Sequence, residues 1–354
     1  MIEETEKRDS IPDLTYSTDN IPYKKLWEAL SWSADIGCVT LEQLSGLARD
    51  GGLGELVRAS EAFYEHEVDA AVERILLRKQ DLRILIIAGP SSSGKTTTML
   101  KVGERLGKAG VGTVALCADH YFFDLERHPR VGDDYDFETP QALDLELINA
   151  HLGTLIAGGT VEVPRYDFKK GRRDGVSAAL CLRGGEVLLL DSHHGLFPGI
   201  TEAVPERMKA RLYIETLSVL RDSRKRYIRW ADVRMLRRMV RDSRFRNYSP
   251  RDTVRHWHLV RRSELAYIVP ELTKAHAIVN SFLPYELPVL KKRVQPWIDP
   301  MIGELRADPS AADALERISR VRDMLREVPE AGEDIVPPES LLREFIGGSA
   351  LEYR

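Results

Sequence analysis

The feature that most constrains the fold of this chain is a glycine-bounded turn that directly follows a short apolar run. Residues 83–88 read Arg-Ile-Leu-Ile-Ile-Ala, which is an apolar run of strand length. The next eight residues, Gly-Pro-Ser-Ser-Ser-Gly-Lys-Thr, satisfy the pattern G-x-x-x-x-G-K-[ST]. Apolar residues then recur at helical spacing, at Met99, Val102 and Leu106. The order of strand, glycine-rich turn and helix predicts a nucleotide-binding α/β fold.

Each residue type in this turn has its own chemical reason. Glycines allow backbone N–H groups to wrap an anion without a Cβ in the way. Lys95 is expected to reach the β- and γ-phosphates of a nucleotide, and the Thr96 hydroxyl is expected to complete the shell of a Mg²⁺ ion. The predicted nucleotide-binding residues of the turn are Gly89, Pro90, Ser91, Ser92, Ser93, Gly94, Lys95, Thr96 and Thr97.

Length and composition set the class of protein. The chain has 354 residues, of which 43% are hydrophobic, so it can bury the core of one large domain or two smaller ones. Its three cysteines lie far apart without metal-ligand spacing, which favours reduced thiols inside a cell. The N-terminus lacks the apolar region of a signal peptide, and no apolar run approaches the roughly 20 residues that a membrane span needs. We therefore expect a cytoplasmic protein without membrane contact.

The net charge of −4 hides a strongly basic block. Residues 221–262 carry 15 Lys and Arg against 4 Asp, a local charge of +11 that leaves −15 for the remainder. The block is typical of two amphipathic helices, the first over about 222–241. The second begins with Ser249 as its N-cap and Pro250 at its first helical position. Inserted before the last predicted core strand, these helices resemble a lid.

Strand and helix patterns alternate along the middle of the chain. Further strands are expected over 113–117, 186–191, 210–214 and 277–280, and a hairpin is expected to project from the sheet over about 161–182. We predict a parallel sheet flanked by helices. The predicted parts are a helical N-terminal extension over 1–80, a P-loop domain over 81–290 with its lid at about 221–262, and a helical C-terminal extension over 291–354. Residues 1–25 are expected to wrap the surface or fray.

Two carboxylates stand where strands are predicted to end. Asp119 follows the strand over 113–117, and Asp191 closes the apolar run over 186–191. Functional residues of open α/β sheets gather at the carboxyl ends of strands, so Asp119 is a catalytic candidate. An apolar strand that ends in an acid is the local form of a Walker B strand, so Asp191 is a candidate Mg²⁺ ligand. Adjacent histidines point to different sides of most backbones, so His193 and His194 favour substrate contact or packing over a zinc site.

Together these motifs resemble the uridine kinase and phosphoribulokinase family of P-loop kinases, in particular the bacterial uridine kinase-like proteins whose phosphate loop reads Gly-Pro-Ser-Ser-Ser-Gly-Lys-Thr-Thr. The likeness runs from about residue 56 to the C-terminus, and the first 55 residues or so have no counterpart. The motifs that carry it, besides the loop, are Asp119 with Tyr121 and the runs 136–140, 164–168, 194–196, 237–242, 285–287 and 342–349.

The resemblance implies an ATP- and Mg²⁺-dependent phosphotransferase that acts on an alcohol group. It gives Asp119 the role of base or orienting group at a nucleoside 5′-hydroxyl, and it gives Glu138 the ribose hydroxyls. Tyr166 and Phe168 are implied to flank the base. The implied substrate set is Tyr121, Glu138, Tyr166, Phe168 and His194, and the implied metal ligands are Thr96 and Asp191.

Arginines of the basic block are implied to grip the phosphates. Arg238, Arg241 and Arg246 match the lid arginines best, with Arg246 on the ATP side. The implied catalytic set is Lys95, Asp119, Arg238 and Arg241. Positive charge of this kind suits a loose phosphoryl-transfer transition state, which needs positioning and charge stabilisation more than covalent help.

The chain departs from the family pattern at three places. The family's Glu-Gly at the Walker B strand is Asp191-Ser192 here, and the Arg-Gly-Arg of the lid is Arg246-Asn247-Tyr248. The histidine that reads the pyrimidine edge falls at Gly171. Because specificity comes largely from polar groups that the wrong ligand leaves unpaired, losing this histidine removes the contact that singles out uridine. The sequence supports a kinase more strongly than it supports uridine.

Three functions remain open. The first is ATP-dependent phosphorylation of a nucleoside at its 5′-hydroxyl, and the second uses the same machinery on a sugar, sugar phosphate or other small alcohol. The third is a nucleotide-dependent regulator or an RNA-binding protein that uses the basic block. That block lacks a recognised nucleic-acid motif, so we expect a small-molecule substrate and no nucleic-acid partner. The choice of ATP or GTP as donor and assembly into a homo-oligomer stay open.

Overall fold

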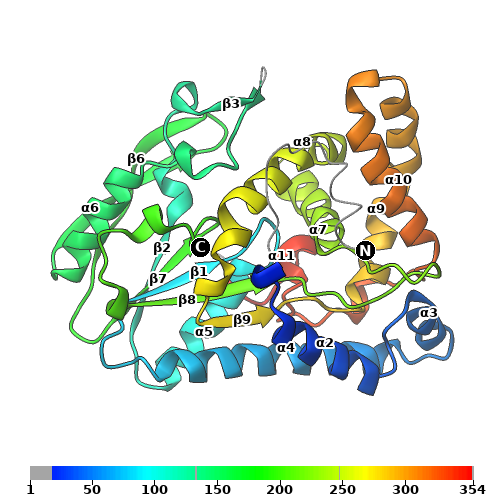
Figure 1. Cartoon of the computed structure of the whole chain (residues 1–354), viewed down its shortest axis with the longest axis horizontal. Coiled ribbons are helices and arrows are strands. Elements are labelled where there is room, and N and C mark those ends of the chain that lie inside the picture. The colour runs from blue at the N-terminus through cyan, green and yellow to red at the C-terminus, as the bar shows by residue number, and fades with distance from the viewer. Residues whose placement is uncertain (1–17, 132–133, 247, 353–354) are drawn as a thin grey trace.

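A five-stranded parallel sheet with the strand order β2-β7-β1-β8-β9 forms the centre of the chain, and helices flank it (Figure 1). This is a computed structural model, and it describes residues 18–131, 134–246 and 248–352. The first 17 residues, which we predicted to wrap the surface or fray, lie outside the described residues, as does Asn247 of the predicted lid. The predicted α/β architecture is confirmed.

Every predicted core strand is present within two residues of its expected bounds. The central strand is β1 (Ile84–Ala88), all five residues of which are buried, as expected for a strand covered on both faces. Its neighbours are β7 (Val187–Ser192) and β8 (Lys209–Glu215), and the edges are β2 (Thr113–Cys117) and β9 (Ala277–Asn280). The hairpin is also confirmed, because β5 (Thr160–Asp167) and β6 (Arg172–Cys181) form an antiparallel pair apart from the main sheet.

Along the chain, helices occur both before and after the phosphate-binding turn. Those before the phosphate-binding turn are α2 (Tyr23–Asp35), α3 (Leu41–Arg49) and α4 (Leu53–Leu76), and those after it are α5 (Lys95–Lys108), α6 (Leu145–Ile156), α7 (Trp230–Phe245), α8 (Pro250–Ser263), α9 (Glu286–Arg306), α10 (Ala312–Arg326) and α11 (Arg343–Ile346). A short 3₁₀ turn, η2 (Ala118–Tyr121), follows β2. Among the described residues, no helix is both long and apolar enough to cross a membrane.

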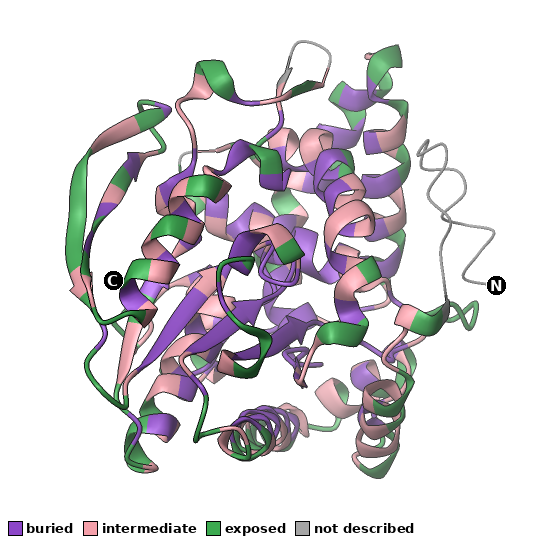
Figure 2. Ribbon diagram, turned by 60° about the vertical axis from the view of Figure 1, so that its left-hand side comes forward, coloured by how far each residue is buried: buried purple, intermediate pink, exposed green. Residues whose placement is uncertain are grey.

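One hydrophobic cluster joins the parts into which we divided the chain. It contains Leu44 of α3, Tyr64 of α4, Leu85 of β1 and Phe345 of α11, all of them fully buried. Figure 2 shows the sheet as the buried centre of the molecule. The N- and C-terminal extensions therefore share their core with the P-loop domain.

The basic block folds differently from our prediction at its start. We expected a helix from about residue 222, but α7 begins only at Trp230. The carboxylate of Asp222 accepts hydrogen bonds from the backbone N–H and the side chain of Arg226, each at 2.8 Å, and Lys225 has a φ of +62°. Such side-chain bonds to the backbone compete with helix formation, so residues 221–229 form a turn.

The two arginine-rich helices themselves are confirmed, and Ser249 caps α8 as predicted by accepting a bond from the N–H of Asp252 at 3.0 Å. However, α7 does not stand apart from the molecule as a lid. It packs against α8, α9 and α11, and it buries Met235, Leu236 and Met239 in the main core. Packing thus fixes α7 in place.

Candidate active site

The turn at residues 89–96, here called the phosphate turn, joins β1 to α5 in a conformation that requires its glycines. Gly94 has a φ of +91°, a region that favours glycine. A Cβ on Gly89 would lie 2.5 Å from the carbonyl oxygen of Ile214 in β8. The backbone conformation at Gly94 and the close approach at Gly89 therefore explain why the motif has glycine at both positions.

The first turn of α5 presents N–H groups that have no acceptor within the helix. Thr98 makes the first helical bond, to the carbonyl of Gly94 at 3.1 Å, so the N–H groups of Lys95, Thr96 and Thr97 precede it. The ammonium of Lys95 donates to the carbonyls of Gly89 at 2.9 Å and Pro90 at 3.2 Å. These donors and the helix dipole favour a phosphate at this point.

The two predicted acids lie at the carboxyl ends of neighbouring strands. Asp191 is the register partner of Cys117, and Asp119 follows Cys117 by two residues. Burial and the charges of Asp119 and Glu344 raise the pKa of Asp191, and Lys95 lowers it, so that the pKa is about 7 on balance. Carboxylate and hydroxyl oxygens suit Mg²⁺, and a divalent cation would relieve this crowding of acids. The side chains of Thr96 and Asp191 thus fit the predicted metal.

Three arginines of α7 reach the phosphate turn, two more than the sequence led us to expect. Arg238 donates to the hydroxyl of Ser91 at 3.1 Å. Arg234 donates to the carbonyl of Ser91 at 3.2 Å, and Arg237 donates to the carbonyl of Ser92 at 3.4 Å. A spacing of three and four residues places all three on one face of the helix. That spacing could have identified Arg234 and Arg237, and Arg237 also lies in the run 237–242 that carries the resemblance.

Buried carboxylates hold these additional arginines. Arg237 and Glu286 are both fully buried, with bonds of 2.6 and 2.9 Å between them. Arg234 pairs with Glu264 at 2.9 Å and with Glu215 at 2.8 Å. The acids come from the end of β8, the end of α8 and the start of α9, so only the fold brings them to α7.

The predicted lid arginines converge on one acid, Asp242. Arg238 lies 3.1 Å from its carboxylate, Arg241 lies 2.7 Å away and Arg246 lies 3.7 Å away. Burial alone would raise the pKa of Asp242, but Arg241 and Arg238 lower it on balance. The charge of Asp119 acts on Arg246 as well, so this half-exposed arginine faces the predicted base.

Tyr166 and Phe168 lie in a group of rings that we call the aromatic cluster, made of Phe122, His128, Phe137, Tyr166 and Phe168. The ring centres of Tyr166 and Phe168 are 5.0 Å apart, and those of His128 and Phe137 are 4.6 Å apart. Phe168 is 58% exposed and Phe137 is 37% exposed. The cluster thus joins Phe122, which follows η2, to residues 128–137 and to β5 with its turn, and Phe137 and Phe168 present apolar faces to solvent.

The segment that carries His128 packs against Gly171 through Leu125, a contact that the sequence did not indicate. The carbonyl of Gly171 accepts a bond from the N–H of Leu125 at 2.8 Å, which brings residues 125–128 against the hairpin turn. Nε2 of His128 donates to the carbonyl of Phe123 at 2.7 Å, so Nδ1 carries the lone pair in the neutral ring. Burial lowers the pKa of His128, and its Nδ1 has no hydrogen-bond partner among the described residues.

Glu138 links the arginines to the aromatic cluster. Its carboxylate lies 2.8 Å from Arg238 and 3.6 Å from Nε2 of His193. Burial lowers the pKa of His193 to about 3, so the ring is neutral. His194, the residue that we predicted to contact substrate, is buried and packs edge-on against Tyr267 at 6.0 Å. His193 thus faces Glu138 more directly than His194 does.

Two further expectations concern the same region. The hydroxyl of Tyr121 lies 2.9 Å from Nδ1 of His151 in α6, and the side chain is fully buried. This contact directs the hydroxyl of Tyr121, which we predicted among the substrate residues, toward α6. In the part of the chain that the structure describes, no group of three or more His, Cys, Asp and Glu side chains is arranged to hold a metal ion.

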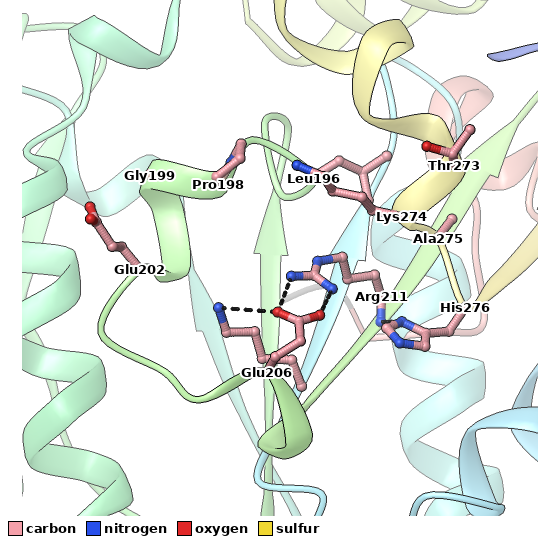
Figure 3. A pocket seen from close by; sticks show the side chains of 11 residues that line it. Leu196, Pro198, Gly199, Glu202, Glu206, Arg211, Thr273, Lys274, Ala275 and His276 are labelled. Carbon is pink, nitrogen blue, oxygen red and sulfur yellow. Dashed lines mark hydrogen bonds and ion pairs between the residues drawn. The ribbon is translucent and has the colours of Figure 1, made fainter. Parts of the chain in front are cut away.

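A cavity of about 750 Å³ lies at the opposite end of the sheet, where β8 and β9 begin (Figure 3). Lys209, Arg211 and His276 line it, together with Glu206. The carboxylate of Glu206 bonds Arg211 and lies 3.7 Å from Lys209, so both cations share one counter-ion. None of the predicted site residues lines this cavity, so the candidate active site is the edge that carries the phosphate turn.

Comparison with known proteins agrees with this geometry. The model of the Phosphoribulokinase / Uridine kinase family matches residues 84–286, which run from β1 to the start of α9. The chain belongs to this family. As a member, it is a kinase, a phosphotransferase that acts on a hydroxyl group. The matched segment contains every residue that we predicted to be functional.

Two similar proteins are named uridine kinase. A uridine kinase of Deinococcus deserti is 30% identical over 200 residues, which cover 55% of this chain and 86% of the relative. A uridine kinase of Halobacterium salinarum is 29% identical over 159 residues, covering 44% of this chain and 60% of the relative. A solved structure of a possible uridine kinase from Bacillus stearothermophilus is 19% identical with a TM-score of 0.34, covering 42% of this chain and 79% of that one.

Proposed function

We propose that this kinase transfers the γ-phosphate of ATP to the 5′-hydroxyl of a nucleoside. Membership of the family implies ATP as the phosphate donor and a small molecule as the acceptor. The observation that supports a nucleoside as the acceptor is a continuous series of contacts. Ser91 of the phosphate turn bonds Arg238, Arg238 bonds Glu138, and Phe137 beside Glu138 packs in the aromatic cluster.

Along this series, successive residues suit the triphosphate of the donor, the reacting hydroxyl, the ribose and the base. The phosphate turn and Lys95 hold the triphosphate of the donor, and the reacting hydroxyl lies beside Asp119. Glu138 has an acid's capacity to accept bonds from ribose hydroxyls. Phe137 and Phe168 offer exposed faces on which a planar base can stack, which is worth about 1–3 kcal/mol per base. A sugar or sugar alcohol has no planar base that could stack on these rings.

The reaction needs charge and position rather than a covalent partner. Asp119 orients the acceptor hydroxyl and takes its proton. Arg238, Arg241 and Arg246 place positive charge on the oxygens of the transferred group, and their anchoring by Asp242 fixes that charge before reaction. Mg²⁺, when bound, neutralises charge on the β- and γ-phosphates, and Thr96 and Asp191 are the residues that would hold it.

We propose no nucleic-acid partner, because three central arginines of the basic block are paired inside the protein. Arg234, Arg237 and Arg238 are paired with buried acids and with the phosphate turn. These side chains have no free charge to present to a phosphate backbone as an outer basic stripe would.

An acceptor screen tests the proposal. Purified enzyme with ATP or GTP would be offered nucleosides, deoxynucleosides, sugars, sugar phosphates and sugar alcohols, and ADP or GDP release would be measured. We expect release above background with one or more ribonucleosides. A response confined to sugars or sugar alcohols would replace the nucleoside with that acceptor, and a flat response would favour a nucleotide-dependent regulator.

A further inference from the structure

A carboxylate from the C-terminal segment binds Thr97, the residue that directly follows the phosphate turn. Oε2 of Glu344, in α11, accepts hydrogen bonds from the backbone N–H of Thr97 at 3.0 Å and from its hydroxyl at 2.7 Å. Glu344 lies beyond the segment 84–286 that the family model matches. The contact therefore joins the start of α5 to a segment outside that match.

The N–H group that Glu344 takes is one that a nucleotide needs. Thr97 is the third residue of α5, so its N–H lies among the donors that precede the first helical bond. In a phosphate-binding turn of this pattern, the backbone N–H groups cradle the α- and β-phosphates. Glu344 thus places an anionic oxygen where a phosphate oxygen would accept the same bond.

We propose that Glu344 is a residue of the nucleotide site, where its carboxylate stands in for a phosphate in the free enzyme and rotates away when a nucleotide binds. The inference rests on the proposed function to the extent that it requires nucleotide binding at the phosphate turn. It does not depend on which molecule accepts the phosphate.

The side chain moves while its backbone stays. Leu341, Leu342, Phe345 and Ile346, which surround Glu344 in sequence, are fully buried. In addition, the carbonyl of Ile346 accepts a bond from Arg244, and the guanidinium of Arg237 lies 5.1 Å above the ring of Phe345. Exposing four buried apolar side chains costs far more than breaking two hydrogen bonds, so release by rotation of Glu344 is the cheaper route.

Charge gives the contact its effect on nucleotide affinity. The charges of Lys95, Asp119 and Glu344 all act on Asp191, so acids already gather near the phosphate turn. A nucleotide must displace one carboxylate from Thr97 and then tolerate it nearby, so its binding is weaker than the phosphate turn alone would allow. Removing the carboxylate should strengthen binding.

The experiment measures ADP binding by titration calorimetry, without acceptor and with EDTA in place of Mg²⁺. We expect Glu344→Ala to bind ADP about tenfold more tightly than the wild type, which corresponds to the loss of about one charged hydrogen bond. Glu344→Gln keeps an amide oxygen for Thr97 and should fall between the two. Glu339→Gln, an exposed acid of the same segment, is the matched control and should bind as the wild type does.

A thermal scan separates this role from a merely structural one. Glu344→Ala removes a helix-capping bond, so the free variant should melt at a lower temperature, but ADP should raise its Tm more than it raises that of the wild type. Unchanged or weaker ADP binding by Glu344→Ala would overturn the inference. Absence of nucleotide binding in the wild type and in every variant would contradict the proposed function itself.

Discussion

At the scale of single residues, Asp119 and Asp191 have different surroundings although they end neighbouring strands. Both side chains are half-buried, but burial and neighbouring charges raise the pKa of Asp191 near Lys95 to about 7, and the charge of Asp119 acts on Arg246. We propose that Asp191 meets a cation and that Asp119 meets a substrate hydroxyl. The two roles can therefore be tested separately.

Asp119→Asn should stop phosphate transfer and leave nucleotide affinity nearly intact. The amide keeps the shape of the side chain but cannot take a proton, and loss of general base catalysis typically costs about 10²–10⁴ in rate. Turnover would be followed by coupled ADP release, and ATP affinity by calorimetry, where a change within about threefold is expected from a residue outside the phosphate turn. Near-normal turnover would contradict the assignment of Asp119 as base.

His128 is the residue that we expect to read the base in place of the histidine that falls at Gly171. Its unpaired Nδ1 can accept one bond from an N–H of the base. His128→Ala should raise KM for the nucleoside about tenfold or more with a smaller change in kcat, because a buried polar contact gives about 1–3 kcal/mol of discrimination. The ATP KM of the same variant serves as the internal control. Equal loss of kcat for every acceptor would instead indicate a general packing role.

At the scale of elements, α7 contacts the phosphate turn and packs in the main core, whereas we expected it to form part of a lid. The sequence predicts the strands, the turn and the N-cap of α8 well, because each depends on residues within about one turn or strand of one another. It does not predict Arg234 and Arg237 as contacts of Ser91 and Ser92, since their buried partners Glu215, Glu264 and Glu286 lie in other elements. The start of α7 was missed because Asp222 binds its own backbone turn.

Breaking the pair between α7 and α9 should destabilise the whole protein. Arg237→Met leaves Glu286 buried without its cation, which costs about 3–5 kcal/mol of unfolding free energy. The double variant Arg237→Met with Glu286→Leu should recover much of this loss, because replacing both partners removes the uncompensated charge. Urea unfolding measures both. The control Arg246→Met changes a half-exposed arginine and should shift the free energy by less than about 1 kcal/mol.

The pair between Arg234 and Glu264 predicts a loss of stability in acid. Burial alone would raise the pKa of Glu264, but Arg234 and Arg261 lower it to about 2 on balance. A carboxyl whose pKa is lower in the folded state stabilises fully above its ordinary value, near 4.5, and loses that contribution as pH falls toward 2. The unfolding free energy should fall across this window, and less steeply in Glu264→Gln than in the exposed control Glu330→Gln. Equal slopes would contradict the prediction.

At the scale of the whole molecule, the extensions at the two ends are part of the enzyme's core. The helices before β1 and after β9 share one hydrophobic cluster with the sheet, and α11 brings Glu344 to Thr97. Sequence patterns could predict that both extensions are helical but not where they dock, because docking depends on contacts between residues more than 200 positions apart. The proposed nucleotide site thus includes a contact from the C-terminal end of the described chain.

The most direct test of the proposed function identifies the product. Wild-type enzyme would be incubated with ATP, Mg²⁺ and a ribonucleoside that is active in the screen, and the product would be analysed by mass spectrometry and phosphorus NMR. The matching 5′-deoxynucleoside, which lacks the reacting hydroxyl, serves as control. We predict a nucleoside 5′-monophosphate formed in equal amount with ADP and no product from the control. Phosphate on another hydroxyl, or ADP release that continues unchanged with the control, would contradict the proposal.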